Sequence, residues 1–314
     1  MLTCTLDQRN MESLNVIVKD KNKLSLLNRF EAKDFTDDDI KGLSKLGIVD
    51  NNGAPLDQVR PTLSILSNPY AVVKFTFTGG AGIFEHNINY DHTFLNHVTL
   101  TVTPSDFSID DEVNPQGILP ILQDFIGKSN LKSINISGRY TVTEALVIAA
   151  ILDIERRSYL RAFMDEVPAG RNNYNANLIW RIINSTSNSI QWFVSVLNDV
   201  IGDHVALAPS QVQEGINGLI SKGVMTQNSG QYNLTGELAT LSSRMLIIDN
   251  ILTTHILRLD DKKDILSTGF TCIQSGVHDL LFLDYDGNEV IFETLSSVGL
   301  LEYLEQFFNC KAYF

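Results

Sequence analysis

Residues 36 to 53 read TDDDIKGLSKLGIVDNNG, and residues 212 to 229 read VQEGINGLISKGVMTQNS. A shift of 176 positions (216 less 40) aligns five identical pairs, which are Ile40 and Ile216, Gly42 and Gly218, Leu43 and Leu219, Gly47 and Gly223, and Asn52 and Asn228. In the first stretch an apolar stripe at helical spacing predicts a helix, and Gly47 is typical of the position just past a helix end. The chain therefore repeats one local pattern.

A second repeated pattern closes each half of the chain. GILPILQDFIG starts at Gly117 and GLLEYLEQFFN starts at Gly299, a shift of 182 (299 less 117). Two patterns in the same order at nearly the same shift indicate a duplicated unit that is too long for a solenoid repeat. We expect an α+β fold that forms one internally duplicated, pseudo-twofold body.

Each half is expected to contain a helix-turn-helix or winged-helix-like segment, antiparallel strands and a closing helix. We place the first half at residues 1–130 and the second at 207–314, with a helical segment at 131–206 between them. Thr141-Val-Thr-Glu144 is a capping box that predicts the start of a long helix reaching about Asp165. The stretch from Leu234 to Leu246 also predicts a helix.

The segment YAVVKFTFT, from Tyr70 to Thr78, predicts a β-strand. Its alternation places Val73, Phe75 and Phe77 on one face, and the glycine-rich stretch at 79–82 that follows predicts a hairpin turn. This turn is not a phosphate-binding loop, because it lacks the GK[ST] sequence and does not lead into a helix.

Composition places the chain among ordinary globular proteins, with 44% hydrophobic and 19% charged residues. The longest apolar run, Ala145 to Leu152, is far shorter than the roughly 20 residues that span a bilayer. The first ten residues lack the basic start and apolar core of a signal peptide. Three cysteines without CxxC spacing suit a reducing compartment. We expect a soluble cytosolic protein with no membrane insertion.

Charge argues against nucleic-acid binding by the winged-helix-like segments. The formal net charge is −13, and residues 36–66 hold three basic residues against five acidic ones. A DNA-binding module neutralises phosphates with Lys and Arg, and this segment offers no basic face for that. We therefore expect no nucleic-acid partner, although a duplicated winged-helix transcriptional regulator stays open as an alternative.

Sequence motifs for chemistry are absent. The segment EHNINYDHTFLNH offers Glu85, His86, Asp91, His92 and His97, yet no spacing among them matches a known zinc motif. We find no nucleophile elbow, Walker motif or dinucleotide fingerprint. The sequence therefore predicts no catalytic residues, no metal and no cofactor, and an uncharacterised enzyme is the other alternative.

The order of patterns resembles the EspG-type chaperones of type VII (ESX) secretion. The resemblance rests on the helix and turn from Asp37 to Gly53, on the Leu-rich stretch from Leu63 to Pro69, and on the ending from Phe270 to Phe308. It covers most of the chain in outline. The Asn- and Ile-rich composition departs from the Ala- and Arg-rich mycobacterial members and suggests a distant relative from a low-GC bacterium.

This resemblance implies a non-enzymatic cytosolic adaptor. Such a protein binds the exposed apolar tip of a helical export substrate and keeps that substrate soluble and export-competent. Because the composition departs from the mycobacterial pattern, a WXG- or LXG-like helical protein is the expected partner in place of a PE/PPE-type one. The oligomeric state is left open.

An adaptor needs an exposed apolar patch rimmed by polar groups. The candidate residues for binding the substrate protein are at the predicted hairpin turn and at the end of the last helix: Gly79, Gly80, Gly82, Ile83, Phe84, Phe307 and Phe308. The alternative for each of these side chains is burial against the protein's own core. The loop at 79–97 has no counterpart of the same composition in the second half, so function is expected where the halves differ.

Overall fold

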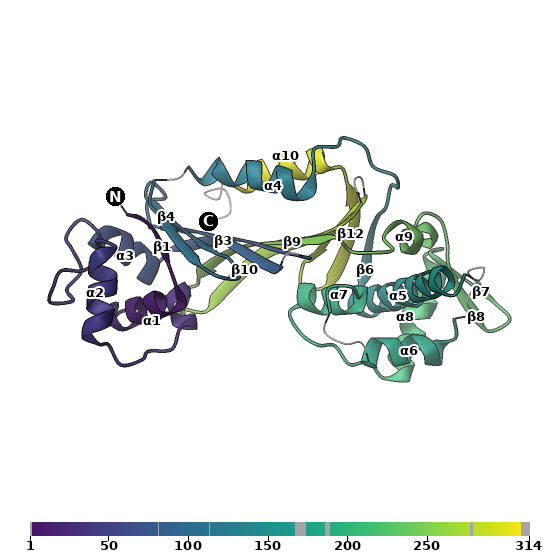
Figure 1. The fold of residues 1–314 in the computed structure, drawn as a ribbon. Coiled ribbons are helices and arrows are strands. Elements are labelled where there is room, and N and C mark those ends of the chain that lie inside the picture. The colour runs from purple at the N-terminus through teal and green to yellow at the C-terminus, as the bar shows by residue number, and fades with distance from the viewer. Residues whose placement is uncertain are drawn as a thin grey trace. The chain divides into compact units, whose positions relative to one another are not determined.

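The computed structural model describes residues 2–80, 82–112, 114–166, 174–185, 189–276 and 279–308. The chain divides into two units (Figure 1). Unit 1 comprises Met1–Leu122, Leu252–Gly269 and Tyr303–Phe314, and unit 2 comprises Gln123–Ile251 and Phe270–Glu302. The predicted division into 1–130, 131–206 and 207–314 follows the sequence repeat and stays a prediction.

Unit 1 contains three α-helices, two short 3₁₀ helices and most strands of the first half among its described residues. These are β1 (Thr3–Leu6), α1 (Gln8–Ile17), η1 (Leu26–Arg29), α2 (Asp37–Lys45), α3 (Arg60–Ser67), β2 (Ala71–Gly79), β3 (Gly82–Tyr90), β4 (His97–Val102), β5 (Phe107–Asp110) and η2 (Pro115–Ile118). The pairs β1–β5, β5–β4, β4–β3 and β3–β2 are all antiparallel. Strand β9 (Asn250–Leu259) lies next to β2.

The core of unit 1 lies between these strands and the N-terminal helices. Leu14 of α1, Leu43 of α2 and Leu63 of α3 join one buried cluster with Leu100 of β4 and Ile109 of β5. Alternation along β4 explains this arrangement, because every second side chain of a strand points to the same face. The helices therefore cover one face of the strands.

Unit 2 contains the long helix predicted after residue 141 and the second strand group. Its elements are β6 (Ser137–Thr141), α5 (Val142–Met164), α6 (Ala176–Ser185), α7 (Phe193–Ile201), α8 (Pro209–Ser221), β7 (Met225–Asn228), β8 (Gln231–Leu234), α9 (Leu238–Arg244), β11 (Asp279–Tyr285) and β12 (Glu289–Leu295). Four elements, β9 among them, pass from one unit to the other; the other three are α4 (Leu119–Ile126), β10 (Ile265–Ser275) and α10 (Ser297–Phe307).

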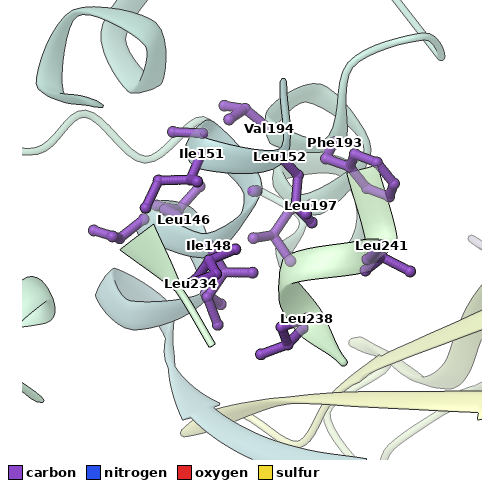
Figure 2. Packing of buried hydrophobic residues seen from close by; sticks show 14 of the residues in the cluster. Leu146, Ile148, Ile151, Leu152, Phe193, Val194, Leu197, Leu234, Leu238 and Leu241 are labelled. Atoms are coloured by element: carbon purple, nitrogen blue, oxygen red, sulfur yellow. The ribbon is translucent and has the colours of Figure 1, made fainter. Parts of the chain in front are cut away.

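Helix α5 is the centre of the unit 2 core. Every residue from Ala145 to Leu152 is at most 1% exposed, as expected for a helix segment that is apolar on all sides. Residues of α7 and α9 pack around it, as Figure 2 shows for Leu197 and Leu241. The predicted capping box is confirmed, because the Thr141 backbone N–H donates to the Glu144 carboxylate at 2.9 Å.

A buried ion pair fixes α7 against α5. The Asp153 carboxylate accepts hydrogen bonds from the backbone N–H groups of Phe193 and Val194, at 2.9 and 3.1 Å, and so satisfies the first turn of α7. Arg156 lies 3.4 Å from Asp153 and donates to the Leu246 carbonyl at 2.9 Å. Both charged side chains are at most 1% exposed.

One predicted helix is corrected by the structure. The segment from Leu234 to Leu246 was expected to be continuously helical, whereas β8 ends at Leu234 and α9 starts at Leu238. Residues 231–234 pair with β7 in an antiparallel hairpin, and Gly236 has a left-handed φ of +60° that separates strand from helix. Strand pairing across the turn outweighs the apolar spacing that suggested a helix.

Among the described residues, no helix is both long enough and apolar enough to cross a bilayer.

Candidate partner-binding surface

The predicted hairpin at 79–82 is present at the end of β2 and β3. The strands pair antiparallel from Ala71–Tyr90 to Gly79–Gly82, which is the last pair before the turn. Gly82 has a φ of +113°, a conformation that only glycine adopts without strain. A side chain at this position would also meet Pro104, because an added Cβ would lie 3.1 Å from its Cγ atom. Gly82 is therefore required by the turn itself.

Two of the predicted binding residues pack on the same face of β2. The ring of Phe84 lies 5.4 Å from that of Phe77, its register partner. The ring of Phe308 lies 5.5 Å from that of Phe75, two residues earlier on the strand. Residues two apart share a face of a strand, so Phe84 and Phe308 converge on one aromatic platform.

Exposure differs among the predicted binding residues. Ile83 is 54% exposed, and Gly80 and Gly82 are exposed beside it. Gly79, Phe84 and Phe308 are half-buried. Phe307 is only 3% exposed, so in this conformation its side chain belongs to the protein's own core. The accessible apolar group at the hairpin is therefore Ile83.

A charged network flanks the hairpin on β2 and β3. Glu85 accepts hydrogen bonds from Lys74 at 3.0 Å and from Arg29 at 2.8 Å. Burial raises the pKa of Glu85, but the hydrogen bond from Lys74 and the charges of Lys74 and Arg29 outweigh it, so the pKa lies below its ordinary value. Glu85 is thus an anion that ties η1 to the hairpin.

The structure brings together only part of the histidine-containing segment: Asp91, His92 and His97 line one pocket, whereas Glu85 and His86 do not line it. His86 is 6% exposed, its Nδ1 lies 2.9 Å from the Thr101 hydroxyl, and burial lowers its pKa to about 4. Glu85 points to the opposite face of β3 because successive side chains alternate. Within the part of the chain that the structure describes, no group of three or more His, Cys, Asp or Glu side chains could hold a metal ion.

The role of Phe75 and Phe77 as the platform for Phe84 and Phe308 was not predicted from the sequence. The alternation of YAVVKFTFT does predict that both rings lie on one face of the strand, and this pattern is the sequence feature that points to the platform. No local pattern links Phe75 to Phe308, because this contact joins residues 233 positions apart (308 less 75).

Comparison with known proteins finds similarity among solved structures. No protein-family model and no curated protein matches the sequence. Among solved structures, the fold matches the Mycobacterium tuberculosis type VII secretion system chaperone EspG5, solved in complex with the PE25-PPE41 dimer. The TM-score is 0.54 at 10% sequence identity, and the match covers 96% of this chain and 93% of that chain.

The chain has the EspG fold. The resemblance inferred from the sequence is therefore confirmed at the level of the fold, and the low identity marks a distant similarity. The match spans nearly the whole of both chains, so the similarity in fold includes both units.

Proposed function

We propose that this protein is a non-enzymatic cytosolic chaperone that binds a helical type VII secretion substrate and keeps it soluble and export-competent. The observation that carries the proposal is the EspG fold, which extends over 96% of the chain. EspG5 was solved bound to the PE25-PPE41 dimer. From EspG5 we transfer to this chain only the class of partner, which is a helical exported protein. We propose that the partner here is WXG- or LXG-like.

The β2–β3 turn is the proposed contact surface. Ile83 is 54% exposed at the turn, and the anchored Glu85 network lies two residues away on the same face of β3. A protein-binding surface has an apolar centre and a polar rim, and we propose that Ile83 and the charged side chains beside it supply part of such a surface. Phe84 and Phe308 are half-buried and pack on Phe77 and Phe75 on the other face of the strand.

The experiment is affinity purification of the tagged protein from its native cytosol, with mass spectrometry of bound proteins. We expect recovery of a small helical exported protein. Ile83→Asp should lower recovery at least tenfold, because burying an Ile side chain is worth roughly 1.5–3 kcal/mol and an unpaired charge adds a penalty. Leu131→Asp is the matched control, because Leu131 is 66% exposed but lies outside the hairpin.

Two results would count against the proposal. One is the absence of any helical exported protein in a strain that expresses the secretion system. The other is equal loss of the partner in Ile83→Asp and Leu131→Asp, which would indicate a general effect of introducing charge.

We also propose that the two halves arose by internal duplication. The element order β1-α1-α2-α3-β2-β3-β4-β5-α4 recurs as β6-α5-α8-α9-β9-β10-β11-β12-α10, with α6, α7 and the β7–β8 hairpin as additions. In each half the first strand pairs antiparallel with the last, β1 with β5 and β6 with β12. This correspondence starts the second copy at β6, within the predicted helical segment 131–206.

Local geometry supports the same correspondence. Gly47 and Gly223 have left-handed φ values of +69° and +70° just after α2 and α8. The next backbone N–H, of Ile48 or Val224, donates to the carbonyl of Leu43 or Leu219 at 3.0 Å in both copies. In an experimentally determined structure, superposing α1 and α2 on α5 and α8 should bring the Gly47 and Gly223 turns into register. A mismatch of these turns would refute the duplication.

A further inference from the structure

A groove lies at the end of the β2–β3 hairpin that is opposite the Gly79–Gly82 turn. Its larger part is a pocket of about 720 Å³ between α3 and the loop 91–96, and an adjoining pocket of about 320 Å³ shares Ser64, Ile65, Asp91 and His92 with it. All of these residues belong to unit 1. Because each strand of the hairpin has nine residues, roughly 25 Å separates the groove from the turn.

The loop that forms one wall is held in a fixed conformation. The Asp91 carboxylate accepts hydrogen bonds from the Thr93 backbone N–H at 3.0 Å, the Thr93 hydroxyl at 2.7 Å and the Asn96 amide at 2.7 Å. Phe94 has a left-handed φ of +57°, which is uncommon for a residue other than glycine. Its ring packs on Tyr70, with 5.6 Å between centroids. This loop presents Leu95 with 77% of its surface exposed.

The groove carries negative charge. Burial raises the pKa of Asp91, but the hydrogen bonds from Thr93 and Asn96 outweigh it and bring the pKa to about 2, so this carboxylate is ionised at neutral pH. Across the pocket, Asp111 accepts a hydrogen bond of 2.6 Å from the Thr62 hydroxyl, and Glu112 is exposed. The described residues that line the two pockets include no Lys or Arg.

We infer that this groove docks a short segment of a partner protein in which basic side chains alternate with aliphatic ones. The carboxylates of Asp91, Asp111 and Glu112 attract the basic heads, and Ile65 and Leu95 supply apolar contacts. Lys and Arg suit such a surface because their long stems pack on apolar groups while their heads stay charged. Complementary charge directs the choice of partner and speeds its encounter.

The loop that forms one wall of the groove is longer than its counterpart in the proposed second copy. Six residues lie between β3, which ends at Tyr90, and β4, which starts at His97, whereas three residues lie between Ser275, the end of β10, and Asp279, the start of β11. The groove is separate from the surface around Ile83, so a basic segment bound here leaves the proposed substrate surface free.

The test is fluorescence anisotropy of the whole chain with a labelled peptide of alternating leucine and arginine. A peptide with glutamate in place of arginine is the comparison. We expect saturable binding of the arginine peptide, weakening as salt rises, and no binding of the glutamate peptide. Glu112→Gln and Leu95→Ser should each weaken binding about 3- to 10-fold.

Two controls separate this site from other effects. Asp38→Asn removes a carboxylate that is 90% exposed on α2, and it should leave peptide binding unchanged. Ile83→Asp should also bind the peptide normally, even though it loses the proposed substrate. Equal binding of the two peptides would overturn the inference, because it would show that the charge of the peptide does not matter. Equal weakening by Asp38→Asn and Glu112→Gln would also overturn it and would indicate general attraction to a chain of net charge −13.

Discussion

A helix–helix contact of the same kind occurs in both units, between α1 and α2 in unit 1 and between α5 and α8 in unit 2. The two helices approach more closely in the second pair. Asn10 and Glu144 occupy the third position after the N-caps of α1 and α5, which are Asp7 and Thr141. A glycine of the second helix faces each of them. An added Cβ at Gly42 would lie 3.4 Å from the Asn10 side chain, an ordinary contact, whereas at Gly218 it would overlap the Glu144 carboxylate.

The two pairs are therefore held together by different means. Glu144 cannot easily move aside, because it accepts hydrogen bonds from the Thr141 backbone at 2.9 Å and from Lys222 at 2.6 Å. In the first pair, Arg9 donates two hydrogen bonds of 2.6 Å to Asp39. Helices α5 and α8 are held by close approach of their backbones, whereas α1 and α2 are held by the ion pair between Arg9 and Asp39 at the side of the contact. The same glycine is thus required in one copy and tolerated in the other.

Gly218→Ala should have the largest effect. We expect a loss of about 1–3 kcal/mol in the free energy of unfolding, because the new methyl group displaces a carboxylate that caps α5 and pairs with Lys222. Urea unfolding followed by circular dichroism measures the loss, and amide hydrogen exchange should show reduced protection in α8. Combining Gly218→Ala with Glu144→Ala should cost less than the sum of the two single changes. Strict additivity would contradict the overlap.

Asp39→Asn should have a smaller effect that depends on pH. The hydrogen bond from Arg9 holds the pKa of Asp39 well below its usual range. A lowered native pKa stabilises the folded state above the ordinary Asp pKa of about 3.9, and the stabilisation is lost as pH falls below that value. Wild type and Asp39→Asn should therefore differ in urea midpoint at pH 7 and converge as the pH falls below 4. A constant difference at all pH values would exclude the ion pair as its cause.

Substitutions of the two N-cap residues should differ less in their effect on the free energy of unfolding. Removing a capping side chain costs about 1 kcal/mol, and this is the expected effect of Asp7→Ala, whose carboxylate accepts from the Asn10 backbone N–H at 2.8 Å. Thr141→Ala should cost less than Asp7→Ala, because the Thr141 hydroxyl accepts from the Glu144 backbone N–H at the longer distance of 3.3 Å, and the bond from the Thr141 backbone N–H to the Glu144 carboxylate survives the substitution. Thermal unfolding of the two variants makes the comparison, and a larger loss for Thr141→Ala would contradict this assignment of the cap bonds.

Gly42→Ala should have the smallest effect, and its sign should be opposite to that of Gly218→Ala. Space exists beside Asn10, so the gain in helix propensity should raise the free energy of unfolding by up to about 1 kcal/mol. Urea unfolding under the conditions used for Gly218→Ala provides the measurement. Destabilisation by more than 1 kcal/mol would show that α1 and α2 approach as closely as α5 and α8.

Local sequence patterns predicted the elements whose stability is local. The TVTE capping box located the start of α5, and alternation located β2 and its turn. Strands β1 and β6 have only four and five residues, and they form through pairing with distant segments, such as Thr3 with Asp110. A strand of this kind gains its stability from its partner, so no periodic pattern within it predicts it.

The candidate surface was predictable to a similar degree. The turn residues and Ile83 follow from the glycine-rich hairpin, and Ile83 is indeed exposed at its end. The burial of Phe307 depends on tertiary packing, which no local sequence pattern predicts. The groove beside Asp91 combines a loop that the sequence singles out with Thr62 and Ile65 of α3, and only the folded chain brings these together.

Site-specific photo-crosslinking in living cells tests the proposed chaperone function most directly. A photoreactive residue would replace Ile83 at the β2–β3 turn, and in a parallel strain it would replace Leu131. We expect a covalent adduct between position 83 and a small helical exported protein, with no such adduct from position 131. An adduct of equal yield from both positions, or no helical exported protein crosslinked at position 83, would contradict it.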